Sequence, residues 1–434
     1  MVVGALTEDI YLFVAGTRPE AVKLAPVILA LKALGRSTIL VATGQHRQLF
    51  SEALAGFGLV ADVDLDVMRI GQTPAEVVGA LVPWLAAEFE VRRPAVVVVQ
   101  GDTASALAGA LAATYARCPL AHVEAGLRSG QRDPFPEEMH RRVIAQMADL
   151  HFAPTMVAMA ALAAEGVCRG DVYLTGNTGI DALHVTRDRL TRDAAEQARL
   201  VQRFAGIDRR RPMIVATVHR RENHGAPLAA ILDAIADLAQ LAEVVIPVHP
   251  SPAVAGPVRA RLAGVAGVHL VPPLEYPAFI WLLAQATLAL TDSGGIQEEA
   301  PALGVPVLVM RDVTERPEGI SSGNARLVGT TRSAIVAAVE GLLADGAAIR
   351  RMAEPALPYG AGDAAARIAG LLVQRFGAQA AHHGDKARKA GGDRARVVDG
   401  DRLAAVEAED GEAHRDAVVE FGRNHDAAGH GIAA

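Results

Sequence analysis

The sequence holds 434 residues, of which 51% are apolar and 4% are aromatic. That length exceeds one ordinary hydrophobic core and suits two lobes with a tail. The formal net charge is −7 and no stretch is strongly basic, which excludes the clustered positive surface that nucleic-acid binding requires. We therefore expect an α/β protein that does not bind nucleic acid and needs only a few cations for a small anionic ligand.

The two cysteines and the amino terminus indicate the compartment. Cys118 and Cys168 lack the spacing of metal ligands, and we interpret them as small buried side chains in a reducing environment. The N-terminal stretch has no basic-then-apolar signal region, and no run reaches the roughly 18 apolar residues that span a bilayer. We expect a soluble, cytoplasmic protein without a metal site or membrane segment.

The first predicted elements are a strand at residues 10–15, a turn at 16–19 and a helix at about 20–34. Short apolar runs then alternate with helical patterns at 74–92 and 104–116. This alternation predicts a parallel sheet covered by helices on both faces. Its further strands are expected at residues 38–42, 96–100, 120–124, 151–153 and 172–175.

The alternation stops at about residues 190–212, where charged residues dominate, and we place the boundary between two lobes there. A second set of strands follows at 214–218, 244–248, 269–271, 288–291 and 305–310. We therefore predict doubly wound lobes at 1–190 and 191–363, with a last helix at 364–376 that packs back on the first lobe. Residues 378–434 are rich in charge and poor in large apolar side chains, which predicts a disordered tail.

Ligands of open parallel sheets bind beyond the carboxyl ends of the strands, so the residues after each strand are the candidates for chemistry. Arg18 and Lys23 lie at a helix N-terminus after the first strand, which suits a diphosphate, although taken alone the pattern favours solvated cations at a helix start. Asp102 follows the strand at 96–100 and could be only a helix cap. Glu124 ends the next strand beside a glycine.

Two further acids, Glu137 and Glu138, open another predicted helix. Acids in a first turn suit the helix dipole, so we expect one of the two to be structural. If Asp102, Glu124 and one of these two glutamates converge at one edge, their like charges raise at least one pKa, as acid–base catalysis requires.

The second lobe supplies cations and a nucleotide cradle. His219 and Arg220 follow the strand at 214–218, and we interpret the histidine as functional although a lone histidine is more often structural. After the strand at 288–291, small residues allow backbone N–H groups at a helix N-terminus to approach phosphate oxygens. The candidate ligands of phosphate and ribose are Ser293, Gly294, Gly295, Glu299 and Arg316.

Taken together, these stretches resemble the non-hydrolysing UDP-N-acetylglucosamine 2-epimerases. The resemblance runs from about Tyr11 to Phe376 and is densest at residues 290–319. The matching stretches are GTRPEAVKLAP (16–26), TGQH (43–46), QGDT (100–103), HVEAGLRSG (122–130), PFPEEMHR (134–141), GNTGIDAL (176–183), HRREN (219–223) and LTDSGGIQEEAPALGVPVLVMRDVTERPEG (290–319).

The resemblance implies two Rossmann-like lobes of the GT-B type that close on a UDP-sugar in the cleft between them, and a homodimer. It assigns the acid–base chemistry to Asp102, Glu124 and Glu137, and places His219 near the diphosphate, where it helps UDP leave. The UDP ligands that it implies are Arg18, Lys23, Ser293, Gly294, Gly295, Glu299 and Arg316.

Some members of this family bind a second UDP-N-acetylglucosamine as an activator. The positions that match their activator site are Gln45, Arg220 and His249. This sequence departs from the pattern at Gly71, where those relatives have arginine, and at Pro250-Ser251, which replaces Leu-Asn. The departures question whether the chain is activated.

The implied reaction inverts C2 of the sugar through loss of UDP to a 2-acetamidoglucal and its re-addition, and it feeds surface polysaccharide synthesis. We expect no cofactor, because the glycine fingerprint of a nicotinamide site is missing. The alternatives are a C2 epimerase of a modified UDP-sugar (3-acetamido or uronate), a GT-B glycosyltransferase, a hydrolysing epimerase, or an inactive UDP-sugar sensor. The transferase and the sensor leave the three acids unexplained.

Overall fold

The computed structural model describes residues 9–377, apart from 46, 66, 68, 70, 168–170 and 355–356, together with a short strand at 397–398. Two parallel sheets, each with its own helices, form the first and second lobes. The predicted fold class is confirmed. Among the described residues, no helix is both long and apolar enough to span a membrane.

The first sheet has the order β14-β7-β6-β5-β4-β1-β2-β3, and its strands pair in parallel. The central strand β4 is a run of four valines and a glutamine, all buried, as a strand covered on both faces requires. The strands are β1 (Ile10–Ala15), β2 (Ser37–Ala42), β3 (Val63–Asp64), β4 (Val96–Gln100), β5 (Leu120–Val123), β6 (Leu150–Ala153), β7 (Asp171–Leu174) and β14 (Val397–Val398). The predicted disordered tail otherwise lies outside the described residues and stays a prediction.

Helices of the first lobe begin where the sequence provides caps. α3 starts with Thr73 as its N-cap, and Glu76 completes a capping box. Thr17 and Glu20 form the same box at α1, so that helix starts at Arg18, two residues earlier than predicted. The helices from the first lobe to the boundary are α1 (Arg18–Ala33), α2 (Arg47–Gly56), α3 (Pro74–Arg92), α4 (Ala104–Tyr115), α5 (Glu137–Met147), α6 (Met156–Ala164), α7 (Thr178–Arg192) and α8 (Ala194–Arg203).

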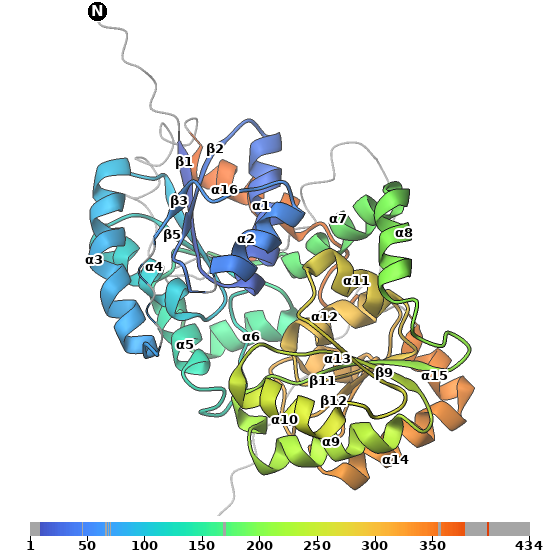
Figure 1. Cartoon of the computed structure of the whole chain (residues 1–434). Helices are drawn as coiled ribbons and strands as arrows, with labels where there is room; N and C mark the ends of the chain where they lie inside the picture. Colours follow the sequence, from blue (N-terminus) through green and yellow to red (C-terminus); the bar gives the residue numbers. More distant parts are fainter. Residues whose placement is uncertain are drawn as a thin grey trace, which may run out of the picture. The chain divides into compact units, whose positions relative to one another are not determined.

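The second sheet has the order β10-β9-β8-β11-β12-β13. Figure 1 shows α9, α10 and α14 along one of its faces. Its strands are β8 (Met213–Thr217), β9 (Glu243–Pro247), β10 (Val268–Val271), β11 (Leu288–Thr291), β12 (Val307–Val309) and β13 (Ala325–Leu327). The helices are η1 (Arg221–Asn223), α9 (Ala226–Leu238), α10 (Pro252–Leu262), α11 (Tyr276–Ala284), α12 (Gly294–Ala302), α13 (Pro317–Ser321), α14 (Arg332–Ala344), α15 (Gly346–Ala353) and α16 (Ala364–Phe376).

Strand order reverses beside the first strand of each sheet, and this fixes where ligands can bind. β1 lies between β4 and β2, and β8 lies between β9 and β11. The turns after β1 and β4 therefore face each other in the first lobe, as do those after β8 and β11 in the second. These four turns, with the first residues of the helices that follow them, carry the singled-out residues Arg18, Asp102, His219, Arg220, Ser293, Gly294 and Gly295.

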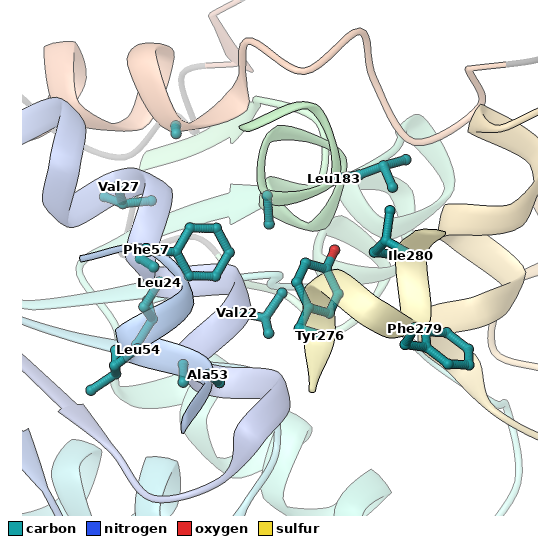
Figure 2. Packing of buried hydrophobic residues seen from close by; sticks show 14 of the residues in the cluster. Val22, Leu24, Val27, Ala53, Leu54, Phe57, Leu183, Tyr276, Phe279 and Ile280 are labelled. Carbon is teal, nitrogen blue, oxygen red and sulfur yellow. The ribbon is translucent and has the colours of Figure 1, made fainter. Parts of the chain in front are cut away.

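The two lobes share an apolar cluster. Figure 2 shows Val22 of α1 beside Tyr276 of α11, and Leu24 of α1 and Leu54 of α2 farther along the same cluster. The rings of Phe57 and Tyr276 lie with their centroids 6.1 Å apart. Burial of these side chains stabilises the contact between the two lobes.

The chain passes between the lobes twice. Residues 190–212, where the sequence showed no alternation of strands and helices, include helix α8. Helix α7, which precedes α8, contacts α1 of the first lobe and α11 and α12 of the second lobe. After the second lobe, α16 returns and packs against α1 and α7, with Ile368 and Leu372 fully buried. The lobe boundary proposed at 190 stays a prediction.

Candidate active site

Glu124 occupies the centre of the candidate site. It follows β5 with a φ of 65°, a left-handed conformation that is rare for a residue with a side chain. Its buried carboxylate is ion-paired with Lys23 of α1 and accepts a hydrogen bond of 3.0 Å from Nδ2 of Asn177. An acid held in unfavourable backbone geometry by several donors is typical of a functional site.

A second buried acid, Glu298 of α12, joins this site from the second lobe. Its Oε2 lies 2.9 Å from Nζ of Lys23, and its Oε1 accepts from Nε of Arg316. Nη2 of Arg316 lies 3.7 Å from Oε1 of Glu124. Two acids and two cations from both lobes thus form one buried charge cluster.

The acids of this cluster have different proton affinities. Burial raises the pKa of Glu124, although Lys23 opposes the effect. Burial acts in the same direction on Glu298, but Arg316 and Lys23 outweigh it and lower its pKa. Glu298 therefore serves as the fixed counter-ion, while Glu124 is the acid of the pair with the greater tendency to hold a proton.

Asp102 lies in the turn between β4 and α4. Its Oδ2 is 2.6 Å from Nη2 of Arg141 on α5. Burial alone would raise the pKa of Asp102, but Arg141 outweighs burial, and Arg220 and Arg316 act in the same direction, so the pKa is lowered. Asp102 is accordingly a carboxylate in this structure and can accept a proton.

The two acids at the start of α5 differ in environment. Glu138 is buried and accepts hydrogen bonds from the backbone of Ser129 at 3.1 Å and from Arg141 at 2.9 Å. Glu137 is half-buried, and no hydrogen bond or ion pair to it is found within the described part of the chain. The contacts of Glu138 fit the expectation that one of the two acids is structural.

A further buried acid, Glu20, holds the turn after β1 against the turn after β4. Its Oε2 accepts from the backbone N–H groups of Gly16 and Thr17 at 3.0 and 2.8 Å, and its Oε1 accepts from Oγ1 of Thr103 at 2.7 Å. Burial raises its pKa to about 7. The turn that carries Arg18 is thereby fixed to the turn that carries Asp102.

His219, after β8, is held by Asp292, after β11. The backbone N–H of His219 donates to Asp292, and the Nδ1 atom lies 3.2 Å from its Oδ1. Although burial opposes it, the contact with His219 helps lower the pKa of Asp292 to about 2. The His219 ring also stacks on His249, with centroids 5.7 Å apart. The contacts with Asp292 fix the position of the His219 imidazole at the end of β8.

The predicted nucleotide-binding helix begins two residues earlier than expected, because α12 starts at Gly294 and not at 296. Ser293 is its N-cap, and a Cβ at Gly295 would meet no atom within 4 Å. Free backbone N–H groups at this N-terminus suit a diphosphate. Arg316 lies against Gly294 and completes the anion site.

Glu299 and Arg18 lie beside the cradle. Oε1 of Glu299 accepts a hydrogen bond of 2.8 Å from the hydroxyl of Tyr276, and burial raises the pKa of Glu299 to about 7. Arg18 of the first lobe donates to the carbonyl oxygen of Leu274 in the second lobe at 2.8 Å. The structure thus brings the predicted UDP ligands of both lobes to one region.

The three residues matched to an activator site follow three different strands: Gln45 follows β2, Arg220 follows β8 and His249 follows β9. Gln45 accepts a hydrogen bond of 3.0 Å from Ser105 near the Asp102 turn. Arg220 is 3.2 Å from Glu315, and His249 stacks on His219. Among the described residues, no group of three or more His, Cys, Asp or Glu side chains could hold a metal ion.

Known proteins match this arrangement. A family model described as UDP-N-acetylglucosamine 2-epimerase matches residues 30–373. A relative from Yersinia pestis, named UDP-N-acetylglucosamine 2-epimerase, is 44% identical over 363 residues, which are 82% of this chain and 96% of that protein. The chain belongs to the UDP-N-acetylglucosamine 2-epimerase family.

Other proteins named UDP-N-acetylglucosamine 2-epimerase are similar to this chain over most of its length. The Bacillus subtilis protein of that name is 41% identical over 370 residues, covering 84% of this chain and 95% of that protein. A crystal structure from Neisseria meningitidis bound to UDP-GlcNAc has a TM-score of 0.81 and 39% identity, and covers 84% of this chain and 99% of that one. One from Methanocaldococcus jannaschii in complex with UDP-GlcNAc and UDP has a TM-score of 0.74 and 30% identity, with coverage of 84% and 99%.

Sequence reasoning missed several residues that build the site. Glu298, Asn177 and Arg141 are buried and make the contacts to Lys23, Glu124 and Asp102 described above. Arg141 stands one turn after Glu137 on the same helix, which is a usable signal. Asn177 and Glu298 carry no such signal, because their partners come from distant parts of the chain.

Proposed function

We propose that this chain interconverts UDP-N-acetylglucosamine and UDP-N-acetylmannosamine by inverting C2 of the sugar. The observation that carries the proposal is the buried cluster in which Glu124 meets cations of both lobes, Lys23 and Arg316. Such a cluster places an acid–base group next to charges that stabilise a leaving diphosphate. Family membership and the UDP-GlcNAc named in the two related crystal structures support the substrate class.

The reaction must overcome a C2 proton that is not acidic, because no carbonyl is adjacent to C2. A carboxylate removes this proton, the C2–H electrons form a C1=C2 double bond, and the C1–O bond breaks with its electron pair leaving on UDP. The intermediate is a 2-acetamidoglucal. In the return step an oxygen of UDP attacks C1, and a proton is delivered to the opposite face of C2.

The acids suit the two halves of this path. The pKa of Asp102 is lowered and that of Glu124 is raised, and a pair with divergent pKa values can divide the roles of proton acceptor and donor. Glu137 is the third acid, and the absence of a protein partner among the described residues leaves it free to reach the sugar.

Departure of UDP is assisted by the second lobe. The N-terminus of α12 and the guanidinium of Arg316 offer positive charge to the diphosphate. His219, oriented by Asp292, can donate a proton or a hydrogen bond to the leaving oxygen. A closed junction between the lobes keeps the glucal and UDP together until re-addition.

Proton NMR of the purified protein with UDP-N-acetylglucosamine in D₂O, without added NAD, metal or acceptor, tests the proposal. We expect UDP-N-acetylmannosamine with deuterium at C2. Release of free UDP and N-acetylmannosamine would indicate a hydrolysing epimerase. An unchanged spectrum would contradict the proposed substrate, and 3-acetamido and uronate UDP-sugars and acceptor-dependent transfer would then be tested.

We further propose a homodimer in the cytoplasm whose product serves surface polysaccharide synthesis. Light scattering tests the assembly, with a monomer mass contradicting it. The proposed activator residues Gln45, Arg220 and His249 are tested by the rate at increasing UDP-N-acetylglucosamine, since activation by substrate makes the curve sigmoidal.

A further inference from the structure

Two buried histidines bind successive backbone carbonyl groups in the turn that carries Asp102. Nε2 of His122 lies 2.8 Å from the carbonyl oxygen of Gly101, and Nδ1 of His140 lies 2.7 Å from the carbonyl oxygen of Asp102. A carbonyl oxygen can only accept, so each of these ring nitrogens must carry the proton. The two contacts thereby fix the tautomer of each imidazole.

We propose that His122 and His140 are positioning residues, which hold the Gly101–Asp102 turn so that the Asp102 carboxylate meets the sugar in reactive geometry. This inference rests on the proposed function of Asp102. Neither histidine is placed in contact with the substrate, and both act through the backbone of the turn.

The turn needs external support. Gly101 has a φ of 69°, a left-handed conformation, and its N–H donates to the carbonyl oxygen of Val123 at 3.0 Å. The next two carbonyl groups are the ones that the histidines bind. Consequently the two peptide groups on either side of the Asp102 Cα are each anchored by a side chain from another element.

The anchoring elements also carry the other proposed acids. His122 lies in β5, two residues before Glu124, and His140 lies in α5, three residues after Glu137. Arg141, the neighbour of His140, binds the Asp102 carboxylate itself. The strand and the helix therefore fix Asp102 relative to Glu124 and Glu137. In the proposed reaction these acids together must reach both faces of C2 of the sugar.

The environment of His122 supports a role as a neutral donor. The side chain is fully buried, and burial lowers its pKa to about 3. A neutral imidazole with its proton on Nε2 is a stable donor over the whole working range of pH. Misplacing a catalytic group by about 1 Å can lower a rate on the order of a hundredfold, so loss of such a donor is measurable.

The test compares variants that remove the donor with variants that keep it. His140→Leu removes the donor, whereas His140→Asn places an amide N–H where Nδ1 stood. His122→Leu and His122→Gln form the matching pair for Nε2. His151→Leu is the control, because His151 is fully buried in the adjacent strand opposite His122 and no contact joins it to the Gly101–Asp102 turn in the described structure.

We expect the His140→Leu and His122→Leu variants to lower kcat about tenfold to a hundredfold, with KM and the Kd for UDP within about twofold of the wild-type values. The Asn and Gln variants should recover most of kcat, and His151→Leu should match the wild type. Wild-type kcat in both Leu variants, or equal losses in the Leu and the amide variants, would overturn the proposal.

Amide hydrogen exchange of residues 102–107 gives a second readout that does not depend on activity. Exchange should be faster in His140→Leu than in the wild type and unchanged in His140→Asn. If the wild type shows no epimerisation but exchange follows this pattern, the proposed function fails while the anchoring of the turn stands. Unchanged exchange in both Leu variants refutes the anchoring even if the enzyme is active.

Discussion

The guanidinium of Arg316 lies directly against Gly294 at the start of α12. A Cβ atom built at Gly294 would lie 2.5 Å from Nη1 and 2.6 Å from Cζ of Arg316, closer than real Cβ atoms approach. Arg316 has little freedom to retreat, because Glu298 and Glu315 hold it and its side chain is 7% exposed. Glycine at 294 is therefore required for the helix N-terminus and the arginine to form one anion-binding surface.

Gly294→Ala should weaken UDP binding about tenfold or more, equivalent to at least about 1.4 kcal/mol. The added methyl group displaces the guanidinium from the phosphate site. Isothermal titration calorimetry with UDP measures the effect. Gly341→Ala in α14, where a Cβ would meet nothing within 4 Å, is the control and should bind UDP as the wild type does.

Glu137→Gln and Glu138→Gln should separate catalysis from stability. Glu137→Gln should lower kcat by on the order of a hundredfold and leave the melting temperature unchanged, because no protein partner within the described chain depends on the charge. Glu138→Gln should lower the free energy of unfolding by about 1–3 kcal/mol, since Arg141 loses a buried partner. Steady-state kinetics and thermal denaturation measure the two effects, and the opposite pattern would refute the assignment.

Asp181 should make stability depend on pH. Burial raises its pKa from the ordinary 3.8 to about 6, while its Oδ1 accepts from the backbone N–H of Ala365 at the start of α16. The native state thus prefers the protonated acid, so its contribution to stability is complete below pH 3.8 and is lost as pH rises through about 6.

Asp181→Asn removes the titrating group and should flatten this dependence. At pH 7.5 the variant should be more stable than the wild type, by at most about 3 kcal/mol, and at pH 4 the two should be similar. Melting temperatures from pH 4 to pH 8 check this. The control is Asp188→Asn, on the exposed side of α7, whose melting temperatures should follow the wild-type curve. An Asp181→Asn curve parallel to that of the wild type would disprove the explanation.

Phe57→Ala should lower the free energy of unfolding by about 3 kcal/mol or more. Phe57 is 8% exposed and packs near Tyr276 across the two lobes, so truncation leaves a cavity in the shared cluster. Urea denaturation measures the change. Val60→Ala is the control, because Val60 is 79% exposed and should change stability by less than about 0.5 kcal/mol.

Much of the fold and part of the site could be predicted because strands of parallel sheets are local apolar runs with polar residues at their ends. From this pattern we predicted β4 and the position of Asp102 after it, and β11 and the helix N-terminus that follows it, close to where they are observed. The two-residue strand β3 and the three-residue strand β13 were missed, since such short runs give no periodicity. Helix α8 was missed because its apolar stripe buries only Leu200 in a charged segment.

The partners of the acids could not be predicted, because they depend on contacts over long chain separations. Lys23 and Glu298 are 275 residues apart in sequence, and Glu124 and Asn177 are 53 apart. Nothing local distinguishes Glu298 from Glu299, yet one contacts Lys23 and Arg316 while the other accepts from Tyr276. The choice between Glu137 and Glu138, in contrast, is local, because Arg141 lies three residues after Glu138 on the same helix and binds it.

The return of α16 to the first lobe has a consequence for how the chain acquires its structure during synthesis. The surface of α1 and α7 that Ile368 and Leu372 help to cover belongs to a lobe that, apart from α16 and the short strand β14, is made before residue 193. Because synthesis proceeds from the N-terminus, this apolar surface stays uncovered while the whole second lobe is translated. The ribosome-bound first lobe is thus a natural client for chaperones until the last helix emerges.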